Sequence, residues 1–140
     1  MNKALAVPKH STSADLALLV IRVVAGLAFM LHGWPKIQKP FDWMGEDAFA
    51  PGIFLALAAV AEFGGGLAWI LGLLTPLASF GIAATMAVAF WMHAVMRGDP
   101  FVSIGGPSYE LAAVYFCIAL LLFTLGPGRF SIDRRFFGAR

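Results

Sequence analysis

Four long apolar blocks dominate the sequence. They cover about residues 14–33, 51–74, 76–96 and 107–125, and short segments with Gly, Pro and charged residues separate them. Each block has roughly 20 residues, and at about 1.5 Å per residue a helix of that length crosses a hydrocarbon core of about 30 Å. The pattern predicts an all-α fold, a bundle of four antiparallel transmembrane helices that forms a single membrane domain over residues 1–140.

The composition supports a membrane protein. Hydrophobic residues make up 60% of the chain and charged residues only 13%, whereas a soluble domain carries about 25% charged residues. The lone cysteine, Cys117, excludes an internal disulfide and a CxxC redox centre. We expect it to pack as a small buried hydrophobe inside the fourth block.

The segments between the blocks predict where the helices end. The first block follows the polar stretch NKALAVPKHSTSAD and has no cleavage pattern, so we interpret it as a permanent span and not as a signal peptide. We expect it to end at Leu31, because HGWP then supplies a Gly and a Pro. The second block begins near Pro51 and reaches Thr75-Pro76, which predicts a tight turn into the third.

The flanking segments predict contact with the membrane interface. The loop after the first block is rich in Trp and Phe, which gather at the head-group level of a bilayer. The tail after the fourth block mixes Phe with Arg, as an amphipathic interfacial anchor does. We therefore expect an interfacial outer loop and an amphipathic C-terminal tail.

Lys and Arg indicate the orientation, because cytoplasmic segments carry an excess of them. The two tails hold six of these residues and the two outer loops hold three, which predicts that both termini are cytoplasmic. The pI near 9.0 then reflects membrane orientation, and nothing indicates nucleic-acid binding. The six are Lys3, Lys9, Arg129, Arg134, Arg135 and Arg140, and the three are Lys36, Lys39 and Arg97.

Two charged residues stand inside the apolar blocks. Such residues cost about 2.5–3.5 kcal/mol at the centre of a membrane helix and usually face the bundle interior. Arg22 is close enough to the cytoplasmic side to reach the head groups instead, but Glu62 is too deep for that. Gly65, Gly66 and Trp69 follow Glu62 on its own helix face and predict either a close helix contact or a cavity. We expect Glu62 to lie inside the bundle. Arg22 is the cation at comparable depth, and we expect a water or a ligand to bridge the two side chains.

Further polar residues stand near the outer helix ends. Glu110 either contributes to a site or only complements the dipole of the fourth helix. Methionines near His32 and His93 could bind Cu(I) together with the imidazoles, and two histidines could bind haem. Because these residues lack a specific ligand spacing, we expect neither and predict no metal site. The sequence thus predicts an outward-opening polar pocket, with candidate residues Arg22, His32, Glu62, Gly65, Gly66, Trp69, His93, Tyr109 and Glu110.

Three segments resemble the DoxX family of small bacterial membrane proteins. They are LVIRVVAGLAFMLHGWPKI (19–37), AEFGGGLAWILGLLTPLAS (61–79) and YELAAVYFCIALLLFTLGPGRFSID (109–133), and the resemblance covers about residues 16–133. It implies a four-helix bundle in a bacterial inner membrane. The motif positions are Arg22, His32, Lys36, Glu62, Gly65, Glu110, Gly128, Arg129, Ser131 and Asp133.

The resemblance also suggests a function. Some members of the family are similar to subunits of a thiosulfate:quinone oxidoreductase, and others are associated with membrane redox complexes that handle sulfur or oxidative stress. Since the chain has neither a cysteine pair nor a nucleotide-binding glycine loop, we expect no redox chemistry by this chain alone. Our leading hypothesis is an accessory subunit of a membrane redox system, with a quinone or a small oxidised substrate in the pocket and no catalytic residue assigned.

Two other functions remain open from the sequence. In a proton-coupled transporter of small molecules, Glu62 would exchange a proton for substrate. In a non-catalytic scaffold for a membrane complex, Arg22 and Glu62 would only specify helix packing. The lipid bilayer and a protein of a membrane redox complex are the expected partners. The sequence determines neither the ligand nor whether the chain forms a homo-oligomer.

Overall fold

The computed structural model describes residues 6–139, and their regular structure is helical except for one bridge between Val7 and Ala139. The all-α prediction is therefore confirmed. Lys3 and Arg140, which belong to the charge count above, lie outside these residues. The elements are α1 (Thr12–Gln38), the 3-10 helix η1 (Gly45–Asp47), α2 (Gly52–Leu71), α3 (Thr75–Trp91), the π-helix η2 (Met92–Met96), α4 (Glu110–Leu125) and α5 (Ile132–Phe137).

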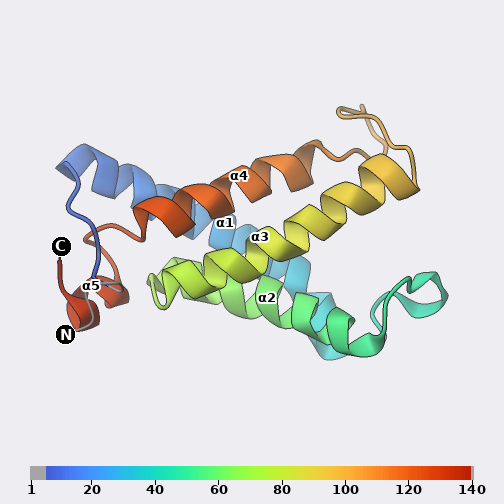
Figure 1. The fold of residues 1–140 in the computed structure, drawn as a ribbon, viewed down its shortest axis with the longest axis horizontal. Helices are drawn as coiled ribbons and strands as arrows, with labels where there is room; N and C mark the ends of the chain where they lie inside the picture. The colour runs from blue at the N-terminus through green and yellow to red at the C-terminus, as the bar shows by residue number, and fades with distance from the viewer. Residues whose placement is uncertain (1–5, 140) are drawn as a thin grey trace.

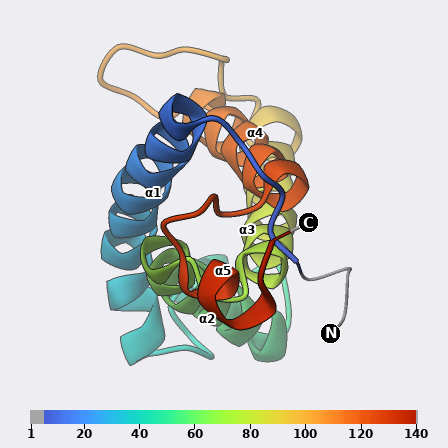
Figure 2. The ribbon, with the colours of Figure 1, turned by 90° about the vertical axis from the view of Figure 1, so that its left-hand side faces the viewer.

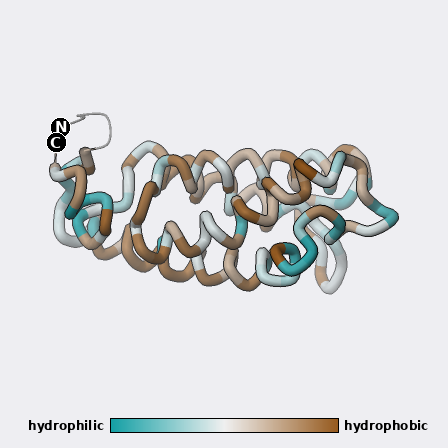
Figure 3. The backbone as a smooth tube through the Cα atoms, turned by 90° about the horizontal axis from the view of Figure 1, so that it is seen from below, coloured by the Kyte–Doolittle hydropathy of each residue, from teal (hydrophilic) through white to brown (hydrophobic). Residues whose placement is uncertain are grey.

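Three of the helical segments are long and apolar enough to cross a membrane. They are α1, α2, and α3 together with η2, while α4 is a shorter apolar helix of 16 residues. Figure 3 shows hydrophobic residues along the helices and hydrophilic residues gathered at the two ends of the molecule. Many large apolar side chains face outward, among them Val24, Leu77 and Phe80. Because soluble monomers rarely expose so much contiguous apolar surface, this exterior fits lipid.

The helices form two pairs. α1 packs along α2 and α3 along α4; α2 and α3 also pack against each other, whereas α1 and α4 make few contacts. A short turn, Gly72–Leu74, connects the pairs, and near this turn α5 lies across the end of the bundle (Figures 1 and 2). We call this the closed end. Away from it α2 and α3 diverge (Figure 1), and we call the far end, which carries η1 and η2, the open end.

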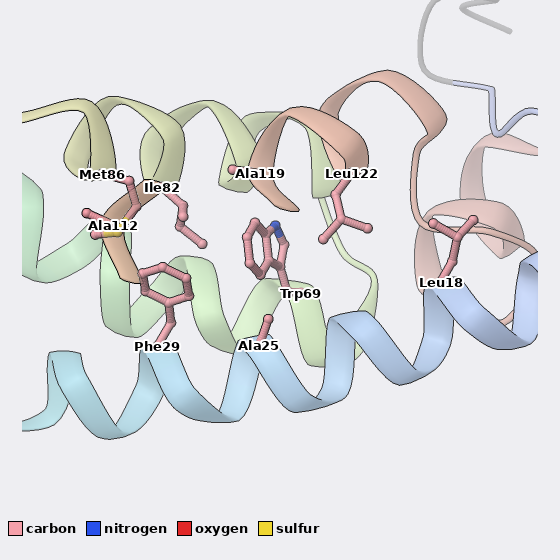
Figure 4. Close-up of a cluster of buried hydrophobic side chains, with 9 residues drawn as sticks. All are labelled: Leu18, Ala25, Phe29, Trp69, Ile82, Met86, Ala112, Ala119 and Leu122. Atoms are coloured by element: carbon pink, nitrogen blue, oxygen red, sulfur yellow. The ribbon is translucent and has the colours of Figure 1, made fainter. Parts of the chain in front are cut away.

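The apolar core joins both pairs at the middle of the bundle (Figure 4). Trp69 of α2 is fully buried beside Phe29 of α1 and Ile82 of α3. Its ring meets Phe29 edge to face at 5.5 Å between centroids, a favourable aromatic geometry. Its indole N–H donates to Ser79 Oγ at 2.9 Å, so the polar atom of this buried side chain is satisfied.

Two glycines allow α1 and α2 to approach closely. A Cβ atom on Gly26 would lie 2.6 Å from the carbonyl oxygen of Gly66, and one on Gly66 would lie 2.6 Å from that of Gly26. Any side chain would therefore force these backbones apart. Contacts between small residues are a common means of packing membrane helices, and this one fixes how α1 lies on α2.

The predicted end of the first helix at HGWP is wrong. α1 continues through Gly33 and Pro35 to Gln38. Proline inside a helix removes one backbone hydrogen bond, but packing opposes a break at this point. A Cβ on Gly33 would lie 2.6 Å from the backbone nitrogen of Phe63, so this turn of α1 rests directly on α2. The extra turn carries Lys36 into the bundle.

The predicted burial of Cys117 is also wrong. Cys117 is exposed on α4. The buried residues of that helix are Ala112, Ala119 and Leu122, which share a face. Cys117 precedes Ala119 by two positions, about 200° around the helix, and so faces away from the core.

Candidate functional site

A cavity of about 1050 Å³ lies between the helix pairs. Its lining combines interior residues, such as Phe29 of α1 and Tyr115 of α4, with exposed residues of α2 and α3, such as Leu57 and Leu77. The cavity therefore passes between α2 and α3 and opens on the side of the bundle, where these helices diverge (Figure 1). Most of its walls are Ala, Gly and larger apolar residues.

The polar part of the wall contains an ion pair between α1 and α2. Lys36 Nζ lies 2.7 Å from both Oε1 and Oε2 of Glu62. The Glu62 side chain is 3% exposed and that of Lys36 24% exposed, and both residues line the cavity. A carboxylate so deeply buried needs a partner, because burial disfavours its charged form. Lys36 is that partner.

Trp43 completes the surroundings of Lys36. Lys36 Nζ lies 4.4 Å from the centroid of the Trp43 ring, which gives a cation–π contact. The indole N–H donates to the carbonyl oxygen of Leu55 at 2.9 Å and so fixes the loop before α2 to that helix. The ammonium group is thus held by a carboxylate and an aromatic ring, and Trp43 also lines the cavity.

A second polar pair stands where η2 ends. Nδ1 of His93 lies 2.6 Å from Oδ2 of Asp99, and the two side chains are 23% and 12% exposed. His93 belongs to η2 and lines the same cavity as Glu62. The cavity wall thus carries the Lys36–Glu62 pair on the side of α1 and α2, and His93 together with Arg97 on the side of α3 and η2, while Asp99 lies behind His93 and outside the lining.

Arg22 lies at the closed end and has other partners. Its side chain is buried and donates to four backbone carbonyls. The acceptors are Trp69 at 2.8 Å, Ile70 at 3.1 Å, Pro127 at 2.6 Å and Phe130 at 3.0 Å. Two of these belong to the end of α2 and two to the segment before α5. Arg22 therefore joins the C-terminal segment to α1 and α2, and it makes no pair with Glu62.

Two buried carboxylates complete the closed end. Asp133 accepts from the backbone N–H groups of Leu74 at 2.7 Å and Thr75 at 2.8 Å, and so caps the start of α3. Asp15 accepts from the backbone N–H of Arg129 at 2.9 Å. The GPGR-x-S-x-D motif thus attaches the tail to the ends of α1, α2 and α3.

The predicted site residues fall into two groups. His32, Glu62, Gly65 and His93 line the cavity, whereas Arg22, Gly66, Trp69, Tyr109 and Glu110 do not. Gly66 contacts α1 and Trp69 fills the core, as described above. Tyr109 packs between Phe90 and Phe101, with ring centroids at 5.0 and 5.3 Å. Glu110 is exposed in the first turn of α4.

Lys36, Trp43 and Arg97 line the cavity but are absent from the candidate pocket residues, and so is Asp99, the partner of His93. Lys36 had a detectable signal, because Gly26, Phe29, Gly33 and Lys36 follow Arg22 at helical spacings of four and three. A helix continued past Leu31 places all of them on one face. Within residues 6–139, no group of three or more His, Cys, Asp or Glu residues could hold a metal ion.

Comparisons with known proteins agree with the resemblance. Residues 17–94 match the DoxX family. The inner membrane protein YqjF of Escherichia coli is 33% identical over 127 residues, which cover 86% of this chain and 92% of the relative. An uncharacterized protein of Haemophilus influenzae is 33% identical over 122 residues, covering 86% and 90%. An uncharacterized membrane protein of Mycobacterium tuberculosis is 30% identical over 132 residues, covering 85% and 80%. No solved structure matches the chain.

Proposed function

This chain belongs to the DoxX family of integral membrane proteins, and on that premise we propose that it is an accessory subunit of a membrane redox system that binds a quinone in its lateral cavity. One observation carries the proposal. A largely apolar cavity opens between α2 and α3 on a surface that fits lipid, and the pair Lys36–Glu62 lines it. Such a cavity admits a molecule that is dissolved in the bilayer and carries a polar head.

The proposal includes a topology. α1 to α4 cross a bacterial inner membrane as an antiparallel, single-domain bundle, and the closed end with both termini faces the cytoplasm. The excess of Lys and Arg in the two tails supports this orientation. α4 has 16 residues, or about 24 Å at 1.5 Å per residue. Local thinning of the bilayer accommodates so short a span at modest cost.

The size and chemistry of the cavity suit a quinone. Ligand cavities commonly measure about 300–1000 Å³, with apolar walls and a few polar groups that orient the ligand. Ala58, Ala61, Gly81 and Ala84 leave room for an isoprenoid tail between α2 and α3. Lys36 Nζ offers a hydrogen to a quinone carbonyl. These side chains bind and orient the quinone but do not transfer electrons to it. The electrons therefore come from a redox partner.

Equilibrium binding of decyl-ubiquinone in mild detergent tests the proposal. Ala84 and Ala87 are both exposed on α3, but only Ala84 lines the cavity. We expect Ala84→Phe to weaken binding at least tenfold by filling the entrance and Ala87→Phe to leave it unchanged. Equal effects of the two variants on binding would contradict the proposal. So would a protein that binds no decyl-ubiquinone and contains no quinone after purification from its native membrane.

The same protein distinguishes the other two functions. A transporter needs Glu62 to release Lys36 in every cycle, because the lysine holds both carboxylate oxygens. The transporter function would be favoured if proteoliposomes take up a small molecule along a pH gradient and if Glu62→Gln abolishes this uptake. A stable partner whose activity is unaffected by Ala84→Phe would favour the scaffold.

A further inference from the structure

The loop after η2 holds His93 and Asp99 together at two points. Asp99 accepts from His93 Nδ1 at 2.6 Å, and its own backbone N–H donates to the carbonyl oxygen of His93 at 2.9 Å. Gly98, at φ +67°, provides the left-handed turn that returns the chain toward η2. The ring of His93 therefore has a defined position and does not rotate freely at the end of a helix.

This arrangement determines which ring nitrogen is available to a ligand. A carboxylate has no hydrogen to give, so the hydrogen of the 2.6 Å contact belongs to Nδ1. In the uncharged imidazole Nε2 then carries a lone pair and acts as an acceptor. Among residues 6–139 Nε2 has no hydrogen-bond partner, and His93 lines the cavity.

Two groups of the cavity wall that can bind a ligand, Lys36 Nζ and His93 Nε2, thus have opposite hydrogen-bonding character, and Arg97, which also lines the cavity, adds a donor on the side of His93. Lys36 Nζ is a donor only, on the side of α1 and α2. His93 Nε2 is an acceptor, on the side of α3 and η2. A quinone carries two carbonyl acceptors and no donor, whereas the reduced quinol carries two hydroxyl groups that donate. Only the quinol satisfies the lone pair of His93.

We infer that His93 is a specificity-determining residue of the cavity, which accepts a hydrogen bond from a quinol hydroxyl and favours quinol over quinone, and that Asp99 is the residue that positions it. This inference rests on the proposed binding of quinones in the cavity. One hydrogen bond contributes about 0.5–1.5 kcal/mol, which is a preference of up to roughly tenfold.

The test compares decyl-ubiquinol with decyl-ubiquinone by anaerobic equilibrium binding. We expect the unmodified protein to bind the quinol up to about tenfold more tightly. His93→Phe, which keeps an aromatic ring without the acceptor, should abolish the preference. Asp99→Leu should reduce it, because Nδ1 no longer fixes the ring. Asp47→Asn, on the exposed η1 helix, should leave it unchanged.

Ala84→Phe separates failure of this inference from failure of the proposed function. It should weaken the binding of both ligands equally and leave their ratio intact. If the unmodified protein binds both ligands without preference, or His93→Phe weakens both by the same factor, the inference is wrong and the quinone site stands. If the protein binds neither ligand, both the inference and the proposed function are wrong.

Discussion

The two ends of the bundle use buried charge in different ways. At the closed end, four backbone carbonyls surround Arg22, and the buried carboxylate of Asp133 caps the start of α3. At the open end, Lys36 and Glu62 pair with each other beside a cavity of about 1050 Å³. Each end holds a charge inside an apolar helix, and at the open end that charge borders a space large enough for another molecule.

The difference shows why a buried charge is not by itself evidence for a site. Charged residues in membrane helices often mark function. Arg22 nevertheless donates its hydrogens to backbone carbonyls, and it thereby holds the C-terminal segment in place. Lys36 retains partial exposure to the cavity. A buried charge in a binding site differs from a structural one in that it can still contact another molecule.

The largest effect should come from the closed end. Arg22→Leu removes the side-chain donor of four buried or partly buried carbonyl oxygens, of which that of Trp69 keeps the backbone N–H of Gly72. We expect it to cost about 3–5 kcal/mol of folding free energy. The stability of Arg22→Lys should lie between that of the unmodified protein and that of Arg22→Leu. Lysine keeps the charge but lacks the planar guanidinium group that donates several hydrogen bonds at once. Unfolding in mixed detergent micelles measures both variants.

Arg135→Leu is the matched control, since Arg135 is exposed on α5. It should change stability little. If Arg22→Leu proved as stable as Arg135→Leu, the closed end would not depend on Arg22, and the contrast with the open end would disappear.

At the open end, the two halves of the ion pair should behave unequally. Lys36→Met leaves a carboxylate that is 3% exposed without its cation, at a cost of about 2–3 kcal/mol for the unsatisfied buried acceptor. Glu62→Gln leaves an ammonium group that is 24% exposed and still next to an amide oxygen, at about 1 kcal/mol. Thermal unfolding of the single and double variants gives the coupling energy, with the exposed Lys39→Met as control. The reverse order of costs would show that Glu62 is not the more deeply buried partner.

Much of the helical framework could be predicted from the sequence. Apolar blocks of membrane-spanning length reflect the requirement that lipid imposes on the backbone, and the Thr75-Pro76 pair reports the start of α3. The end of α1 could not be predicted in this way. HGWP resembles a helix end locally, but the contact of Gly33 with α2 and the pairing of Lys36 are long-range interactions that local propensity does not contain.

The candidate site was predictable only in part, for the same reason. Glu62 and Gly65 share one helix face, so their common environment follows from spacing. The partners of Arg22 are backbone carbonyls, two of them more than a hundred residues away, and every residue carries such a group. A helix that ends at Leu31 would leave Lys36 in a loop and make Arg22 the cation at comparable depth to Glu62, whereas the longer α1 brings Lys36 to Glu62.

Asp133→Asn tests the cap that fixes the tail to α3. Asp133 accepts with both carboxylate oxygens, from Leu74 and Thr75. Asparagine keeps the shape but supplies one acceptor and no charge, so we expect a loss of about 1–2 kcal/mol. Thermal unfolding should show no loss in Asp47→Asn, which changes an exposed residue. Quinone affinity should be unaffected if the closed end is purely structural, and a selective loss of affinity would argue against the separation of the two ends.

The smallest effect should come from Trp43→Phe at the open end. Phenylalanine loses the N–H that bonds Leu55 and offers a weaker face to Lys36, which should cost about 1 kcal/mol or less. Trp34→Phe is the control, because Trp34 is 56% exposed. In contrast to Asp133→Asn, Trp43→Phe should weaken quinone binding more than it lowers the melting temperature, since the ring lines the cavity. If the two tryptophan variants lost equal stability and quinone binding did not change, Trp43 would not belong to the binding site. The Lys36–Glu62 ion pair would then be the only polar feature that distinguishes the open end in this comparison.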